Sequence, residues 1–160
     1  MNDLLMMAFW SFVLIFPAFV ANSVPVLARG KRPVDFGRNL WDGNRILGDG
    51  KTFEGLAVGL IAGTAVGAVA GYPLQSFLLA LGALVGDMTG AFIKRRLGIA
   101  RGKPAPVLDQ IDFVVGALAF VYPAFPFALE QAVFLVVVTP PIHLVANIGA
   151  YLLKLKPHPW

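Results

Sequence analysis

The chain has 160 residues, of which 58% are hydrophobic and only 14% are charged. Soluble domains carry roughly 25% charged residues, so this composition excludes an ordinary soluble protein. No cysteine is present, which excludes disulfides and thiolate metal sites. The net charge of +4 is modest, so the placement of the basic residues is more informative than their number.

Five apolar segments approach the ~20 residues that a helix needs to cross the hydrocarbon core of a bilayer. The first contains Pro17, Pro123 and Pro126 interrupt the end of the fourth, and Pro140-Pro141 should kink or break the fifth. No basic residue precedes the first segment, so we expect a retained span rather than a cleavable signal peptide. The predicted spans are residues 4–20, 54–71, 74–93, 111–127 and 132–153.

The basic residues predict the orientation of these spans. All 13 Lys and Arg residues lie between the first and second spans, between the third and fourth, or after the fifth. The positive-inside rule places these regions in the cytoplasm and the N-terminus outside. The sequence therefore predicts an all-α integral membrane protein forming one domain over residues 1–160. It has five transmembrane helices, a cytoplasmic C-terminus and two cytoplasmic polar loops, at about 21–53 and 94–110.

Glycines recur at every fourth residue along the second and third predicted spans. Small residues at this spacing let membrane helices approach each other closely. We therefore expect these two spans to pack together, which would hold Asp87 near the cytoplasmic end of a close-packed pair. The glycines are Gly55, Gly59, Gly63, Gly67 and Gly71 in the second span, and Gly82, Gly86 and Gly90 in the third.

The first polar loop ends in GDGKT (48–52), immediately before the second span. This is no Walker A motif, because Arg45 stands where the motif requires a glycine. Flexible glycine backbone, a Lys and a Thr before a helix can still hold a phosphate. A phosphate contact by Lys51 is one interpretation. The other is that Thr52 merely caps the second span, with Glu54 favourable in its first turn.

Three carboxylates are expected close to the second polar loop. Asp109 and Asp112 are three residues apart where the fourth span begins, so they share one helix face. With Asp87 they would suit Mg²⁺, which prefers one or two protein carboxylates plus water and substrate phosphates. The alternatives are that Asp109 and Asp112 only favour a helix N-terminus, and that Asp87 forms a structural ion pair with Lys94.

The remaining polar residues exclude several chemistries. His143 lies within the fifth span and is interpreted as a packing residue. The sequence has no Ser–His–Asp, Cys–His or clustered-His arrangement, so nucleophilic catalysis and zinc chemistry lack support. Carboxylates, cations and glycine-rich backbone instead suit phosphoryl-type chemistry, which depends on positioning and charge neutralisation.

Other function classes fit less well. A small transporter of ions or phosphate could use Asp87 as an intramembrane ion site, but the polar residues crowd one face and no internal repeat is visible. A non-catalytic membrane subunit would leave the dense loop charges unexplained. A CDP-alcohol phosphatidyltransferase would need two late Asp residues four apart, whereas Asp109 and Asp112 are three apart.

Three blocks carry a resemblance that extends over nearly the whole chain: ANSVPVLA (21–28), PVDFGRNLWDGNRILGDGKTFEGLAVG (33–59) and GALVGDMTGAFIKRRLGIARGKPAPVLDQIDF (82–113). Together they resemble the CDP-archaeol synthase family, archaeal relatives of the CDP-diacylglycerol synthases. The resemblance implies a cell-membrane enzyme whose active site faces the cytoplasm. It implies Mg²⁺-dependent cytidylyl transfer from CTP to unsaturated archaetidic acid, an isoprenoid ether lipid phosphate, giving CDP-archaeol and pyrophosphate. No nucleic-acid partner is expected.

The resemblance also implies functional residues in both polar loops. It implies five catalytic residues, of which the three acids would hold Mg²⁺: Asp87, Lys94, Arg95, Asp109 and Asp112. It implies contacts to CTP or its phosphates by Asp35, Asn39, Asp49, Gly50, Lys51, Thr52, Arg96 and Gln110. Further positions that match the family pattern are Gly37, Gly90, Gly98 and Pro106.

Overall fold

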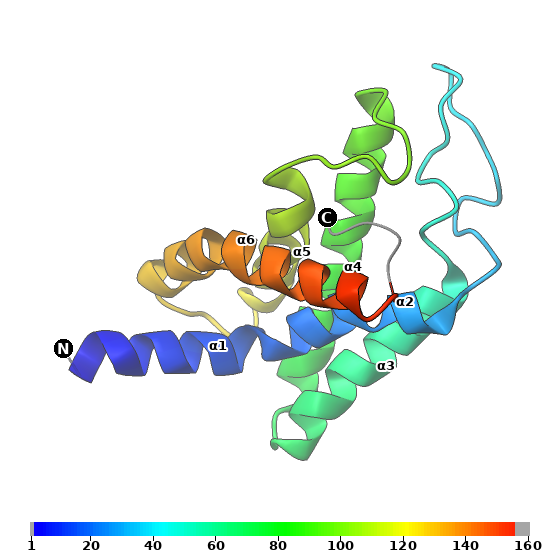
Figure 1. The fold of residues 1–160 in the computed structure, drawn as a ribbon. Coiled ribbons are helices and arrows are strands. Elements are labelled where there is room, and N and C mark those ends of the chain that lie inside the picture. Colours follow the sequence, from blue (N-terminus) through cyan, green and yellow to red (C-terminus); the bar gives the residue numbers. More distant parts are fainter. Residues whose placement is uncertain (1, 156–160) are drawn as a thin grey trace.

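The computed structural model describes residues 2–155, and all regular secondary structure within them is helical (Figure 1). The loop between the second and third helices lies beside the C-terminal end of the fourth helix, the long green helix of Figure 1. The helices are α1 (Asn2–Ser23), α2 (Pro25–Ala28), α3 (Phe53–Val69), α4 (Pro73–Arg96), α5 (Leu108–Val121) and α6 (Leu129–Leu152).

Several helices are suited to a membrane. Three helical segments of the described chain are long and apolar enough to cross a bilayer: Asp3–Ala28, Pro73–Arg96 and Leu129–Leu152. α3 and α5 are apolar but shorter. Large apolar side chains stand exposed on these helices, for example Val69, Trp10 and Val137. Extended apolar surface of this kind is typical of contact with lipid.

The helices coincide with the predicted apolar segments but differ at their ends. α4 continues through Lys94–Arg96, so the second loop begins later than the predicted residue 94. Cations are favourable in this last turn because it is the negative end of the helix dipole. α5 ends at Val121 rather than at 127, because Pro123 and Pro126 follow and cannot continue the helical hydrogen bonding.

The prolines inside the long helices do not divide them. α1 continues past Pro17, and α6 continues through Pro140 and Pro141, where we expected a kink or a break. Within a membrane, neighbouring groups re-satisfy the backbone that proline leaves open, so such helices are tolerated. α6 is thereby kept as one long wall beside α1 and α5.

α4 is the central helix, packed against α1, α3 and α5. The expected packing of α3 against α4 is confirmed, but the glycines of α4 face α5 rather than α3, so they do not make that contact. A Cβ on Gly86 would lie 2.2 Å from the Asp112 carbonyl oxygen, and one on Gly82 would lie 2.5 Å from the Gly116 carbonyl oxygen. The periodicity predicts close packing correctly but does not reveal which neighbour uses it.

The glycines of α3 contact α1 and α4. A Cβ on Gly63 would lie 2.8 Å both from the Ala80 side chain and from the Pro17 carbonyl oxygen. A Cβ on Gly59 would lie 2.6 Å from the Ala21 carbonyl oxygen of α1. α3 and α5 therefore flank α4, and the N-terminal end of α3 and the N-terminal end of α5 both meet the C-terminal half of α4.

Candidate active site

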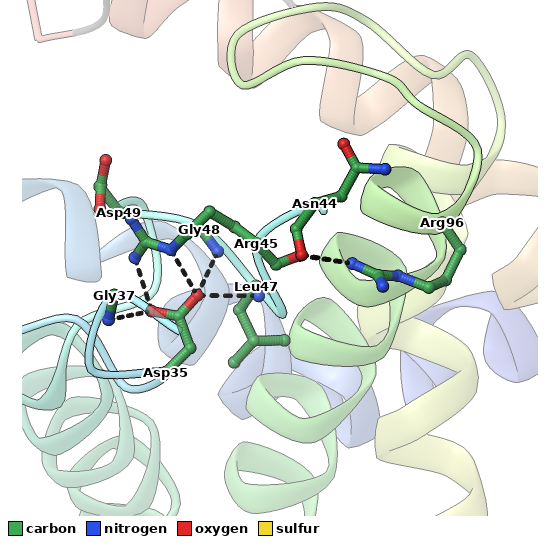
Figure 2. A network of polar contacts seen from close by, with 8 residues as sticks. All are labelled: Asp35, Gly37, Asn44, Arg45, Leu47, Gly48, Asp49 and Arg96. Carbon is green, nitrogen blue, oxygen red and sulfur yellow. Dashed lines mark hydrogen bonds and ion pairs between the residues drawn. The ribbon is translucent and has the colours of Figure 1, made fainter. Parts of the chain in front are cut away.

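The loop between α2 and α3 is held together by a buried carboxylate. Asp35 has a fully buried side chain that accepts hydrogen bonds from the Arg45 guanidinium, at 2.6 and 3.1 Å. It also accepts from the backbone N–H groups of Gly37, Leu47 and Gly48, at 3.1, 3.0 and 2.9 Å (Figure 2). Burial alone would raise the pKa of Asp35, but these hydrogen bonds outweigh it and hold the pKa well below its usual range.

Arg96 fixes this loop to the end of α4. Its guanidinium donates to the Asp42 carboxylate at 2.7 Å and to the Arg45 carbonyl oxygen at 2.5 Å. It also lies 5.1 Å from the centre of the Phe92 ring, within the range of a cation–π contact. In Figure 2 the side chain reaches from the helix to the loop. Asp35 and Arg96 therefore hold the position of GDGKT relative to α4.

Thr52 begins α3 as expected. Its hydroxyl accepts a hydrogen bond from the Gly55 N–H at 3.2 Å, which is the geometry of an N-cap. Glu54 lies in the first turn and pairs with Arg32 at 2.9 Å. The predicted capping role is confirmed, and Lys51 is thereby fixed one residue before the N-cap.

Two ion pairs connect this loop, α4 and α5 around a small polar cavity of about 140 Å³. Lys51 pairs with Asp87 of α4, and Lys94 of α4 pairs with Asp109 of α5 at 2.7 Å. The Ala105 N–H donates a further hydrogen bond to Asp109 at 2.9 Å. The alternative pairing of Asp87 with Lys94 is not formed, because each of these residues has a partner on another element.

Asp112 lies between these pairs at the contact of α4 with α5. A Cβ on Gly90 would lie 2.0 Å from its carboxylate, so only glycine leaves room for the side chain there. The carboxylate accepts the Phe113 N–H at 2.7 Å and lines the polar cavity with Asp87 and Asp109. The predicted close approach of these three acids to one site is thus present in the structure.

The acids fit a Mg²⁺ ion only in combination with a substrate. Within residues 2–155, no three Asp, Glu, His or Cys side chains stand close enough to enclose a metal ion by themselves. Mg²⁺ commonly uses one or two carboxylates together with water and substrate phosphates. The carboxylates of Asp87, Asp109 and Asp112 around one cavity provide oxygen donors of this type.

Two arginines line the polar cavity without an ion-pair partner among the described residues, Arg95 and Arg101. The Nε atom of Arg95 is buried and has no hydrogen-bond partner there. A guanidinium that lines the cavity can bind an anionic group there through charge-assisted hydrogen bonds. These guanidinium groups complement phosphate oxygens.

A second, larger groove of about 740 Å³ adjoins the polar cavity. The two share Gly50, Lys51, Asp87, Lys94, Arg101 and Asp109. Beyond this shared wall the groove is lined by polar residues of α1 and α6 and by apolar residues of α2, α3, α4 and α6, among them Leu56, Leu84 and Ala150. The arrangement can therefore hold a charged group on one side of the shared wall and an apolar group on the other.

The predicted site residues divide into three groups. Gly50, Lys51, Asp87, Lys94, Arg95, Asp109 and Asp112 line the polar cavity. Asp49 and Thr52 line the groove alone. Neither space is lined by Asp35, Asn39, Arg96 or Gln110, so their predicted contacts with CTP have no support in the geometry and stay predictions.

Other lining residues were not predicted. Arg101 lies in the quoted GIARGK segment, and Asn22, Ser23 and Arg29 lie in or beside ANSVPVLA, so the motif blocks could have pointed to them. His143 was interpreted as a packing residue. The centre of its ring does lie 5.6 Å from that of Phe113, but His143 also lines the groove with Asn147, and no motif pointed to either residue there.

Apolar helices around a charged cavity and an adjoining groove indicate a membrane-embedded enzyme. The family model of CarS-like CDP-archaeol synthases matches residues 1–160. The chain belongs to the CDP-archaeol synthase family. It is accordingly a cytidylyltransferase, which decides against the transporter and against a non-catalytic subunit.

Individual relatives agree with this assignment. A CDP-archaeol synthase of Aeropyrum pernix is 51% identical over 92% of this chain and 90% of its own length. Those of Thermococcus gammatolerans and Pyrococcus horikoshii are 47% and 48% identical, over 95% and 100% of this chain and 96% and 99% of theirs. A solved structure of an intramembrane enzyme for archaeal membrane lipid biosynthesis superposes with a TM-score of 0.80 at 50% identity. The match covers 86% of this chain and 92% of that one.

Proposed function

We propose that the chain transfers the cytidylyl group of CTP to unsaturated archaetidic acid, 2,3-di-O-geranylgeranylglyceryl phosphate. A phosphate oxygen of the lipid attacks the α-phosphorus of CTP and forms a new P–O bond. The bond from the α-phosphorus to the bridging oxygen breaks, and pyrophosphate leaves with the electron pair. The products are CDP-archaeol and pyrophosphate. No general base is needed, because a phosphate monoester is already ionised at neutral pH.

The observation that carries this proposal is the wall shared by the polar cavity and the groove. The triphosphate would bind in the polar cavity, with the lipid phosphate approaching from the groove. The two phosphorus centres would then meet at Lys51 and Lys94. A reaction between a water-soluble nucleotide and a lipid needs a polar space and an apolar space that meet at one wall. A hydrolase for one soluble nucleotide does not.

The side chains of the cavity would act mainly through charge. Lys51, Lys94 and Arg95 would bind phosphate oxygens and neutralise the charge that grows on pyrophosphate as it leaves. Asp87, Asp109 and Asp112 would hold Mg²⁺, which supplies Lewis-acid neutralisation of the triphosphate when bound. As substrate phosphates enter, the two lysines would exchange a carboxylate partner for a phosphate, so their charge is retained throughout.

We further propose that five helical segments span the cell membrane, with the N-terminus outside and the site on the cytoplasmic side. The basic residues of the polar loops support this orientation. CTP is a cytoplasmic metabolite that cannot cross a bilayer unaided, so a site open to the cytoplasm suits it. The bilayer would supply the lipid substrate directly to the groove.

The test is transfer of label to lipid by the purified full-length protein. The protein in detergent receives CTP labelled at the α-phosphate, MgCl₂ and digeranylgeranylglyceryl phosphate. We expect labelled CDP-lipid and unlabelled pyrophosphate in equal amounts, and no product with EDTA. With CTP labelled at the γ-phosphate, the label should appear only in pyrophosphate. Lipid labelled from the γ-phosphate, or no lipid product at all, would contradict the proposal.

A further inference from the structure

The larger groove contains one arginine that is absent from the polar cavity. Arg29 lines the groove together with Val26 of α2 and with residues of α6 such as Ala150. It immediately follows the apolar helical segment Asp3–Ala28. A residue at the end of a membrane-crossing segment lies close to the depth of lipid headgroups, where long cationic side chains are favourable.

Arg29 has no partner within the described protein. It forms no ion pair and no side-chain hydrogen bond with any residue between 2 and 155. By contrast, Lys51 and Lys94 on the shared wall are each neutralised by a carboxylate. The guanidinium of Arg29 is therefore available to an anion that enters the groove.

The backbone at Arg29 favours a different residue. With φ 45° and ψ 41°, Arg29 is the left-handed C-cap of α2. Only glycine adopts this conformation without a steric cost, which for other residues is about 1–2 kcal/mol. The local backbone conformation would therefore be more stable with glycine at position 29. We infer that arginine is present because of its side chain and not because of the backbone.

We propose that Arg29 binds the phosphate of the lipid acceptor and positions it for attack on CTP. The inference rests on the proposed function and assigns the acceptor side of the same site. A guanidinium suits this role because its planar fork binds two phosphate oxygens at once and keeps its charge at every physiological pH. The phosphates of CTP are not its ligand, because Arg29 does not line the polar cavity.

The apolar lining agrees with a lipid as the occupant. Besides Arg29, the groove is lined by apolar residues of α2, α3, α4, α6 and the segment after α6, against which a hydrocarbon chain can lie. The apolar lining residues are Val26, Leu56, Leu84, Ala146, Ala150, Leu153 and Leu155. A free phosphate or a second nucleotide would gain nothing from these side chains, whereas an isoprenoid chain would be removed from water by them.

The sharpest test is Arg29→Gly, which removes the guanidinium but suits the left-handed backbone. Steady-state KM values are measured separately for digeranylgeranylglyceryl phosphate and for CTP. We expect the KM for the lipid to rise about 10- to 100-fold, the loss typical of one charged phosphate contact. The KM for CTP should stay within about twofold, since the polar cavity is intact. Arg29→Lys keeps the charge but loses the planar fork. Its KM for the lipid should therefore lie between those of the wild type and of Arg29→Gly.

The matched control is Lys31→Gly, which removes an exposed cation two residues away that lines neither space. Its KM for the lipid should equal that of the wild type. An unchanged lipid KM in Arg29→Gly would overturn the inference, and so would an equal rise in both KM values. In either case the wild type still forms CDP-lipid, so the proposed function stands. Absence of product from the wild type would contradict the proposed function itself.

Discussion

The loop between α2 and α3 and the polar cavity beneath it use the same residue types in opposite ways. In the loop, Asp35 and Arg45 satisfy each other and the surrounding backbone, and neither side chain lines the polar cavity or the groove. In the cavity, Lys51–Asp87 and Lys94–Asp109 connect separate elements and border open space. One group of charges thus holds the scaffold, and the other remains available to a substrate.

The contrast explains why charge alone does not identify an active site. An acid whose hydrogen bonds are all satisfied inside the protein cannot bind metal without breaking the loop. Asp35 is such a residue, although the resemblance gave it the same rank as Asp49 or Lys51. The pairs at the cavity are weaker because they are partly exposed, with 23% and 28% exposure for the side chains of Lys51 and Asp87. Substrate phosphates can therefore replace a partner there.

The largest expected effect comes from the shared wall. We expect Lys51→Met to lower kcat/KM about 10³-fold, because a charge that stabilises the transition state is lost. Cytidylyl transfer by purified enzyme measures it. Lys103→Met is the control, since Lys103 is exposed and lines neither space. If the Lys51 variant kept a tenth of wild-type activity, the division into scaffold and substrate charges would fail at its central residue.

The next effect concerns the carboxylate beside Gly90. Asp112→Asn keeps the shape that the α4–α5 contact requires but loses the negative charge. We expect about a 100-fold lower rate at limiting Mg²⁺, and a higher Mg²⁺ concentration for half-maximal activity. Glu130→Gln, at the start of α6, serves as the control acid. A folded Asp112→Asn enzyme with wild-type turnover at limiting Mg²⁺ would remove Asp112 from the metal site.

Substitutions in the scaffold formed by Asp35 and Arg45 should lower the stability of the loop and hardly change substrate affinity. Asp35→Asn leaves Arg45 without its buried partner, and we expect a loss of about 3 kcal/mol in the stability of the loop. The N–H groups of Leu47 and Gly48 donate hydrogen bonds to Asp35, so the hydrogen exchange of these two amides measures the loss locally. Asp49→Asn, at a side chain that is 57% exposed, should cost less than about 1 kcal/mol. Equal effects of the two substitutions would contradict the scaffold role.

The same carboxylate predicts how the loop responds to pH. Because the pKa of Asp35 is lowered in the folded state, its contribution is fully present above the ordinary carboxyl pKa of about 4. The contribution is lost only as the pH falls below that value toward the folded-state pKa. Protection of the Gly48 amide should therefore be unchanged between pH 7 and pH 5. A loss of protection already at pH 5 would show that the carboxylate is not held as described.

Local signals in the sequence predicted much of this structure, and contacts between distant elements account for the rest. Apolar runs, the Thr52 cap and the prolines after Val121 act within a few residues, so they can be read directly. The pairing of Asp87 with Lys51 could not be predicted in this way, because Lys51 lies 36 residues away in the first loop. Periodic glycines indicate a close helix contact, but two neighbours of α4 compete for it and only packing decides.

The site shows the same limit. The three acids and Lys51 were predicted because their residue types and motif carry the chemistry. Arg29 was not predicted. It stands out because it lines the groove without an ion-pair partner among the described residues and has a left-handed backbone, and only the three-dimensional structure reveals these features. Likewise, nothing in the sequence Lys94-Arg95-Arg96 distinguishes Arg95, which lines the cavity, from Arg96, which binds the loop.

That triplet offers the most direct test of the division between scaffold and substrate charges. Arg95 and Arg96 are adjacent in the last turn of α4, but Arg95 lines the polar cavity and Arg96 binds the loop. The measurement is the KM for CTP together with the thermal midpoint for Arg95→Ala and Arg96→Ala. For Arg95→Ala we expect a KM raised about tenfold or more with little change in the thermal midpoint. For Arg96→Ala we expect a lowered midpoint with a nearly unchanged KM. The reverse pattern, or the same response in both variants, would contradict this division.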